Sequence, residues 1–229
     1  EGSCNVAVGE DSLGANNTGV HNVAVGTIAL LSNTTGGENT AVGWGSQANN
    51  TTAGSNSSFG NQSLCVNSTG CCNTSIGFRT MCSNTTGDNN VALGNNALSK
   101  NTTADGNTAV GYKALLANTT GASNTAVGNI ALDANTTGEN NVAMGSSALT
   151  SNTTGHSNTA VGASALSSTT TGLRNTSVGI ISGSALSTGC NNTFVGYGAG
   201  MRTTTGDNNI AIGCASGCQS TIFHLTTQD

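Results

Sequence analysis

The residues with the clearest chemical signature are asparagines that precede a threonine by two places. Asn-x-Ser/Thr is the acceptor sequence for N-glycosylation in secreted proteins. It recurs nine times at intervals of 17 residues, at Asn16, Asn33, Asn50, Asn67, Asn84, Asn101, Asn118, Asn135 and Asn152. If the copies stack, neighbouring glycans would lie only about 5 Å apart. The sequence therefore leaves two roles open for these residues: partial glycosylation, or a structural ladder of hydrogen-bonded Asn side chains.

Eight cysteines form a second set of reactive side chains. Cys65 and Cys82 are 17 residues apart, so their Cα atoms should lie about 5 Å apart in adjacent repeats, which suits a disulfide. Cys4 precedes the first repeat, and Cys214 and Cys218 lie in the last. We expect these three either to contact a neighbouring subunit or to be free thiols. Eight cysteines without metal-ligand spacing favour an oxidising, extracellular setting.

No pattern in the sequence points to catalysis, a cofactor or a metal. His21, His156 and His224 fall at unrelated places in the repeat, and no acidic or nucleophilic residue recurs beside them. Cys214 and Cys218 lack the second pair of ligands that a zinc site needs. We therefore expect a protein that is not an enzyme and that binds no cofactor or metal.

The composition excludes further classes of protein. The net charge is −5 with only five Lys and Arg residues, so there is no basic stripe for nucleic acid. No apolar run approaches the roughly 18 residues of a membrane span. Only 3% of the residues are aromatic and 7% charged, yet small apolar residues recur at fixed places. This combination favours thin stacked layers over a disordered low-complexity chain.

A strict repeat positions all of these residues. A Gly recurs every 17 residues from Gly9 to Gly213, and an Asn four residues before it recurs from Asn5 to Asn209, thirteen times without an insertion. Numbered from that Asn, the unit reads Asn-Thr-Ala-Val-Gly-x-x-Ala-Leu-x-x-Asn-Thr-Thr-Gly-x-x. We call the residues that share unit position n column n. The sequence predicts one repeat domain over residues 1–229, with units starting at Asn5, Asn22, Asn39 and every 17 residues to Asn209.

A unit of this length predicts the fold class. Seventeen residues are too few for a pair of helices, which needs roughly 30 or more. Glycines at unit positions 5 and 15 indicate two turns, and hence two short strands, at unit positions 1–4 and 7–13. We therefore expect an all-β parallel β-solenoid of 13 coils, forming a rod about 60 Å long.

The alternation within the first strand predicts which side chains point inward. Column 4 is Val, Ile, Leu, Met or Phe in every unit, from Val8 to Ile212, which favours an inward ladder shared with column 2. Column 3 should then point outward, yet it is almost always Ala or Ser. It is either buried against another chain or small in order to fit a tight coil. In the last three units column 9 is Gly183, Gly200 and Gly217 instead of an apolar residue, which predicts a thinner core or a different neighbour there.

The block Asn-Thr-Ala-Val-Gly with downstream Ala-Leu resembles the head repeats of trimeric autotransporter adhesins (YadA-type) and related viral and phage fibre repeats. The resemblance covers Asn5 to about Gly217, although the family's usual unit is shorter. It implies a left-handed parallel β-roll, lateral association of three chains, and heads that bind host or matrix surfaces. Within residues 1–229 we recognise no segment like the neck, coiled-coil stalk or membrane anchor of that family.

Three functions follow as hypotheses. The first is a structural subunit of an extracellular fibre or filament, located outside the cell or on a cell or virion surface, with itself as partner through end-to-end stacking of coils or lateral packing. The second is an adhesin or fibre-head module that forms a discrete trimer and binds glycans or other cell-surface ligands. The third is ice binding through stacked Thr columns at unit positions 13 and 14. The chain starts within the tail of a unit, as expected of a processed or truncated product, and ends without a capping segment.

Overall fold

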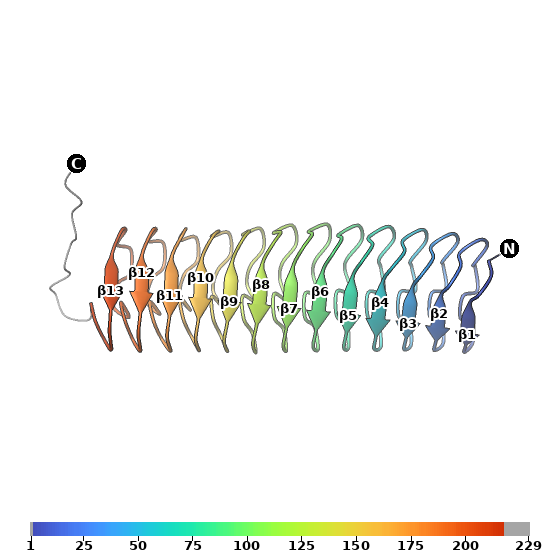
Figure 1. Cartoon of the computed structure of the whole chain (residues 1–229), viewed down its shortest axis with the longest axis horizontal. Helices are drawn as coiled ribbons and strands as arrows, with labels where there is room; N and C mark the ends of the chain where they lie inside the picture. Colours follow the sequence, from blue (N-terminus) through green and yellow to red (C-terminus); the bar gives the residue numbers. More distant parts are fainter. Residues whose placement is uncertain (1, 218–229) are drawn as a thin grey trace.

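The computed structural model describes residues 2–217 as a rod of stacked coils, in which one coil is one 17-residue repeat (Figure 1). One sheet of thirteen parallel strands, in sequence order, runs along the rod. The strands are β1 (Val6–Val8), β2 (Val23–Val25), β3 (Thr40–Val42), β4 (Ser57–Phe59), β5 (Thr74–Ile76), β6 (Val91–Leu93), β7 (Thr108–Val110), β8 (Thr125–Val127), β9 (Val142–Met144), β10 (Thr159–Val161), β11 (Thr176–Val178), β12 (Thr193–Val195) and β13 (Ile210–Ile212).

The register of the sheet is the register of the repeat. Val8 pairs with Val25, and Val25 pairs with Val42, so residues 17 apart lie directly beside each other. The predicted all-β parallel β-solenoid is confirmed. Among residues 2–217 no helix is long and apolar enough to span a membrane.

Each coil contains one short strand, not the two that the sequence predicts. Unit positions 6–11 form successive turns instead. In the third coil, Ser46 N donates to Gly43 O at 3.3 Å and Ala48 N donates to Gly45 O at 3.3 Å. Gly45 and Gln47 have φ values of 64° and 51°. The prediction of a second strand is wrong because an extended strand cannot hold every second residue in the left-handed region.

Close stacking of coils explains the invariant glycine of column 5. Gly43 has φ 131°, and a Cβ placed on it would lie 2.6 Å from the carbonyl carbon of Gly60 in the next coil. A side chain here would therefore clash with main-chain atoms, which cannot move independently of the stack. This glycine sets the corner at which the chain leaves the sheet.

The strand side chains face the opposite way from the sequence prediction. Column 3 points into the coil: Ala41 and Ala92 are fully buried. Columns 2 and 4 point outward, and Leu93 and Met144 in column 4 are each 44% exposed. The inward ladder predicted for column 4 is therefore wrong. The coil is so thin that only small side chains fit between the sheet and the opposite wall, which explains why column 3 is small.

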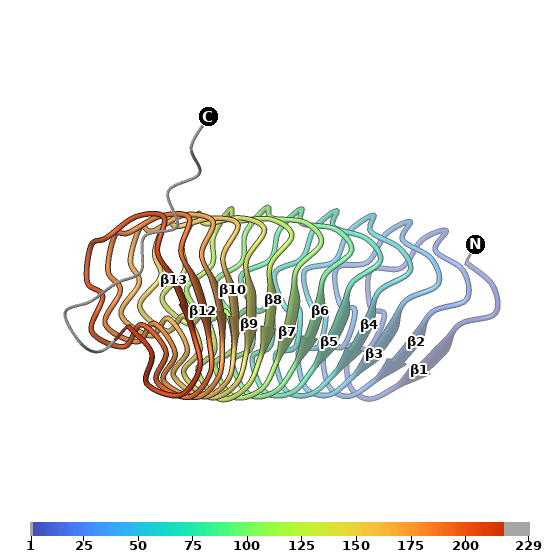
Figure 2. The same ribbon diagram turned by 60° about the vertical axis from the view of Figure 1, so that its left-hand side comes forward.

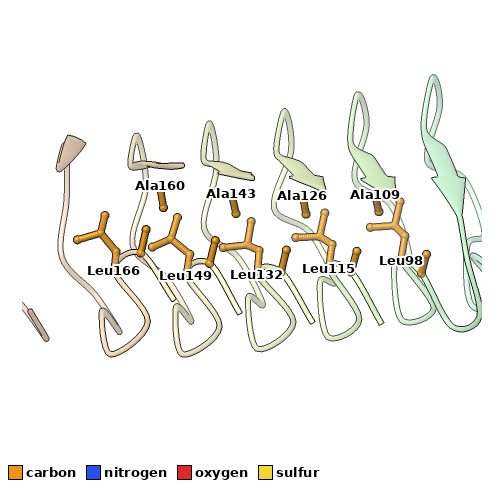
Figure 3. Close-up of a cluster of buried hydrophobic side chains, with 14 of the residues drawn as sticks. Leu98, Ala109, Leu115, Ala126, Leu132, Ala143, Leu149, Ala160 and Leu166 are labelled. Atoms are coloured by element: carbon orange, nitrogen blue, oxygen red, sulfur yellow. The ribbon is translucent and has the colours of Figure 1, made fainter. Parts of the chain in front are cut away.

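The core consists of columns 3, 8 and 9. Figure 3 shows leucines of column 9 stacked one per coil, with the strand alanines of column 3 pointing toward them. Leu98, Leu115 and Leu132 are fully buried, as are Ala109 and Ala126. Most coils repeat this arrangement, and the buried apolar residues form two clusters, one from Ala24 to Ala41 and one from Leu64 to Ala211. Within each cluster a coil depends on its neighbours for burial.

Candidate functional site

The asparagines of column 12 form a buried ladder. Asn50 Nδ2 donates to Asn33 Oδ1 of the preceding coil at 2.9 Å and to Ala53 O of its own coil at 3.0 Å. The same pair of bonds recurs in each coil to Asn152. The Oδ1 atom of Asn152 is buried without a partner, because the next coil has Thr169 at this position. The predicted ladder is confirmed.

This burial contradicts N-glycosylation of most of the predicted acceptors. The eight side chains from Asn33 to Asn152 in column 12 are fully buried. A glycan on Nδ2 would displace one or both of its hydrogen bonds and would need space that the coil does not contain. The prediction is therefore wrong for these eight. Asn16 begins the column half-buried, with Nδ2 3.1 Å from Gly19 O, and its glycosylation stays a prediction.

A second asparagine ladder runs along column 1. Asn22 N donates to Asn5 Oδ1 at 2.8 Å, and Asn39 N donates to Asn22 Oδ1 at 3.0 Å. Asn39 Nδ2 also donates to Ala53 O, at the far end of its own coil. Column 1 therefore ties each coil to the one before and, in most coils, also closes the coil on itself. Both ladders are structural, and beyond Asn5 and Asn16, which begin them, their side chains are buried.

Cys65 and Cys82 occupy equivalent places in adjacent coils, as the repeat predicts. The structure contains both as free thiols. Cys65 Sγ donates to Cys82 O at 3.3 Å, and Cys82 Sγ lies 3.2 Å from Ser99 Oγ. Burial raises the pKa of the Cys65 thiol, and the neighbouring Cys82 raises it further. The disulfide between them stays a prediction.

The other cysteines predicted to contact a subunit lie apart from this pair. Cys4 and Cys214 are exposed free thiols near the two ends of the described rod. Cys218 lies outside the described residues. Cys4 and Cys214 therefore do not meet within the described rod.

Acidic side chains of column 16 bond to main-chain amides of a neighbouring coil. Asp88 Oδ1 accepts from Cys71 N at 2.7 Å, and Asp105 Oδ1 accepts from Asp88 N at 2.7 Å. Across residues 2–217 no group of three or more His, Cys, Asp or Glu side chains is placed to hold a metal ion. These carboxylates thus act as links between coils.

From the sequence we expect an outward face of small side chains in column 3, which misses the large apolar side chains that the structure places on the outside. The large hydrophobic side chains that are exposed among residues 2–217 all belong to columns 2, 4 and 6. They are Val6, Val8, Trp44, Phe59, Ile76, Phe78, Val91, Leu93, Tyr112, Met144, Val178, Ile180, Val195, Tyr197, Ile210 and Ile212. The sequence did contain a signal for this face. Column 4 is apolar in every unit, and its side chains are too large for so thin a core. We call the outward side chains of columns 2 and 4 the apolar ribbon. Column 2 is Val or Ile in five units and Thr or Ser in the other eight.

The apolar ribbon is continuous along the molecule. The strands lie side by side along one side of the rod (Figure 2). Because residues 17 apart pair across neighbouring strands, the outward side chains align in straight columns. Thirteen strands at about 4.8 Å give a ribbon about 58 Å long, with its two columns about 7 Å apart. Columns 2 and 4 contain no charged residue. The ribbon can therefore bury apolar surface against a partner, but it offers no ionic contact.

No protein-family model, no characterised protein and no solved structure matches this chain. The repeat geometry and the exposed columns are therefore the observations on which a function can be argued.

Proposed function

We propose that this protein is a structural subunit of an extracellular fibre, in which the apolar ribbon packs laterally against further copies of the chain. The supporting observation is the ribbon itself, whose area is on the order of 500 Å². The largest apolar patch on a typical monomer covers about 300–600 Å² and is often functional. Column 4 contributes an apolar side chain to the ribbon in every unit. Burial of its Val, Ile, Leu, Met and Phe side chains would provide the free energy of association.

A second copy of the chain is the partner that fits the ribbon best. The ribbon repeats at one coil spacing, so only a partner with the same spacing can match it along its whole length. Because the ribbon contains no charged residue, it offers nothing that would attract a charged partner. A two-fold lateral contact would use the same columns in each copy, because a two-fold interface pairs one patch with itself.

End-to-end stacking is the second contact by which such a fibre would grow. The column 1 ladder joins successive coils in the same way from Asn5 to Asn209. The last coil of another chain could be placed before Asn5 and continue this ladder. A side-chain oxygen of that coil would then accept a hydrogen bond from the main-chain N–H of Asn5. A head-to-tail contact of this kind does not close, so it produces a filament.

Charge substitutions on the ribbon test the proposal. Leu93→Lys with Met144→Lys places two charges in column 4, and Thr103→Lys with Thr154→Lys places the same charges in exposed column 14 of the same units. We expect the first variant to dissociate the native particle and the second to leave its mass unchanged, as measured by light scattering and electron microscopy. A monomeric wild-type chain would contradict the proposal. Discrete trimers without filaments would favour the adhesin-head alternative.

A further inference from the structure

Column 6 has an alternation that neither the core nor the sheet requires. From the third to the eighth unit it reads Trp44, Asn61, Phe78, Asn95, Tyr112 and Asn129. All six side chains are exposed. The three aromatic residues are exposed to nearly the same extent, at 47%, 46% and 48%. They recur every second coil, which places them about 9.6 Å apart along the rod.

This spacing matches the chemistry of one class of polymer. The face of a sugar ring that carries axial C–H groups is apolar and stacks on the π face of an aromatic ring. In an extended β-1,4-linked glycan every second sugar presents the same face, and its disaccharide repeat is close to two coils in length. Asn amides between the aromatic rings can both donate to and accept from sugar hydroxyls.

We propose that column 6 from Trp44 to Asn129 binds an unbranched β-1,4-linked polysaccharide that runs along the rod. Trp44, Phe78 and Tyr112 stack on alternate sugars, and the Asn side chains bond to the hydroxyls of the sugars between them. The proposal goes beyond the fibre function and does not depend on it.

The charges around the column suit a neutral ligand. Column 6 contains no charged residue between Trp44 and Asn129. The nearest cations are Arg79 and Lys113 in column 7, and Lys113 Nζ lies 5.1 Å from the centre of the Tyr112 ring. The Lys113 ammonium group thus lies over one face of the Tyr112 ring, and the sugar stacks on the opposite face. An anionic polymer would need a row of cations, which this column lacks.

Binding of short glycans to the full chain in its native assembly tests the proposal. Isothermal titration would compare cellohexaose and chitohexaose, which share the β-1,4 linkage, with maltohexaose, whose α-1,4 linkage gives a helical chain. We expect binding of at least one β-linked hexasaccharide and none of maltohexaose. Phe78→Ala removes the central ring and should weaken binding by at least about tenfold. Tyr197→Ala is the matched control, because Tyr197 is 58% exposed in the same column but Ala163 lies two coils before it.

A variant with altered ring spacing tests whether glycan binding depends on the two-coil spacing of the aromatic rings or only on their presence. Asn95→Tyr with Tyr112→Asn keeps the composition and moves one aromatic ring by one coil. We expect it to bind as weakly as Phe78→Ala, with an unchanged circular dichroism spectrum and particle mass. Two results would overturn the proposal: no binding of either β-linked hexasaccharide, or wild-type affinity in the spacing variant. Neither result bears on fibre assembly, which the particle mass reports separately.

Discussion

Phe194 occupies core space that a side chain on Gly200 would otherwise fill. Phe194 is the one large residue in column 3, and it is fully buried. A Cβ on Gly183 would lie 2.7 Å from its Cδ2 atom, and a Cβ on Gly200 would clash with the same ring. Backbone conformation does not require these glycines, because Leu166 in the same column has φ 50°, close to the 60° of Gly183. The ring of Phe194 therefore fills the space that leucines at Gly183 and Gly200 would occupy.

This exchange of volume predicts a rescue. Phe194→Ala should lower the free energy of unfolding by about 3–5 kcal/mol, because it leaves a cavity next to two glycines. Adding Gly200→Leu to that variant should recover part of the loss by restoring the column 9 side chain. Urea unfolding would measure both. If the double variant is no more stable than Phe194→Ala alone, the two residues do not share this space.

Gln47 interrupts the leucine column and should be a weak point. It lies between Leu30 and Leu64 in column 9, fully buried, and its Oε1 atom has no hydrogen-bond partner. Gln47→Leu should raise the free energy of unfolding by about 1–2 kcal/mol, because it removes an unpaired acceptor and adds apolar burial. Leu64→Gln, the reverse change in the next coil, should be destabilising. A loss of stability on Gln47→Leu would show that its bonds to Thr40 O and Ser58 Oγ matter more.

The buried ladder of column 12 should be costly to break. Asn118→Ala removes the donor to Asn101 Oδ1 and the acceptor for Asn135 Nδ2. We expect a loss of about 2–4 kcal/mol, because buried polar atoms lose their partners. Asn49→Ala, at an exposed position, should change stability by no more than about 0.5 kcal/mol. If the two substitutions lower the free energy of unfolding equally, as measured by thermal unfolding, the ladder does not stabilise the coil as proposed.

The cysteine pair gives a prediction about oxidation. Joining Cys65 to Cys82 would close a loop of one repeat, so in the chain-entropy model it should stabilise the protein by about 3 kcal/mol. Unfolding in reducing and oxidising buffer, with peptide mapping to identify the bond, measures this. Cys65→Ser cannot form this bond, so its free energy of unfolding should be the same in the two buffers. Failure of the wild type to form the bond under mild oxidant would contradict the prediction.

The reactivity of Cys65 should depend on pH and on folding. Its pKa is raised above the ordinary value of 9.0, first by burial and then by Cys82, so less thiolate is present in the folded chain at a given pH. Iodoacetamide should therefore label Cys65 more slowly in the folded than in the unfolded protein. Because the unfolded thiol ionises first, the stability contributed by this group is present below pH 9 and decreases above it. Equal labelling rates in the two states would contradict this expectation.

The period of the sequence was sufficient to predict the coil, the register and the parallel sheet. Gly9 to Gly213 recur without an insertion, so residues 17 apart had to stack, as Val8 and Val25 do. The Asn ladders also followed from this stacking. The glycan acceptors of column 12 were wrong in eight copies because a sequence pattern does not report whether an amide is buried.

The direction of the strand side chains could not be predicted from hydrophobicity. Column 4 is more apolar than column 3, yet Val42 faces outward and Ala41 inward. Side-chain volume decides the outcome, since Ala41 fits between the sheet and the column 9 side chains of a thin coil and Val42 does not. The same error concealed the apolar ribbon, because residues assigned to the core were not considered as an outer surface.

A cryo-electron microscopy map of the native particle tests the central claim most directly. The account predicts coils about 4.8 Å apart, with Ala24 and Ala41 inside the coil and Val25 and Val42 buried between two copies of the chain. A particle in which column 4 faces solvent along its whole length, or lies inside the coil, would contradict it.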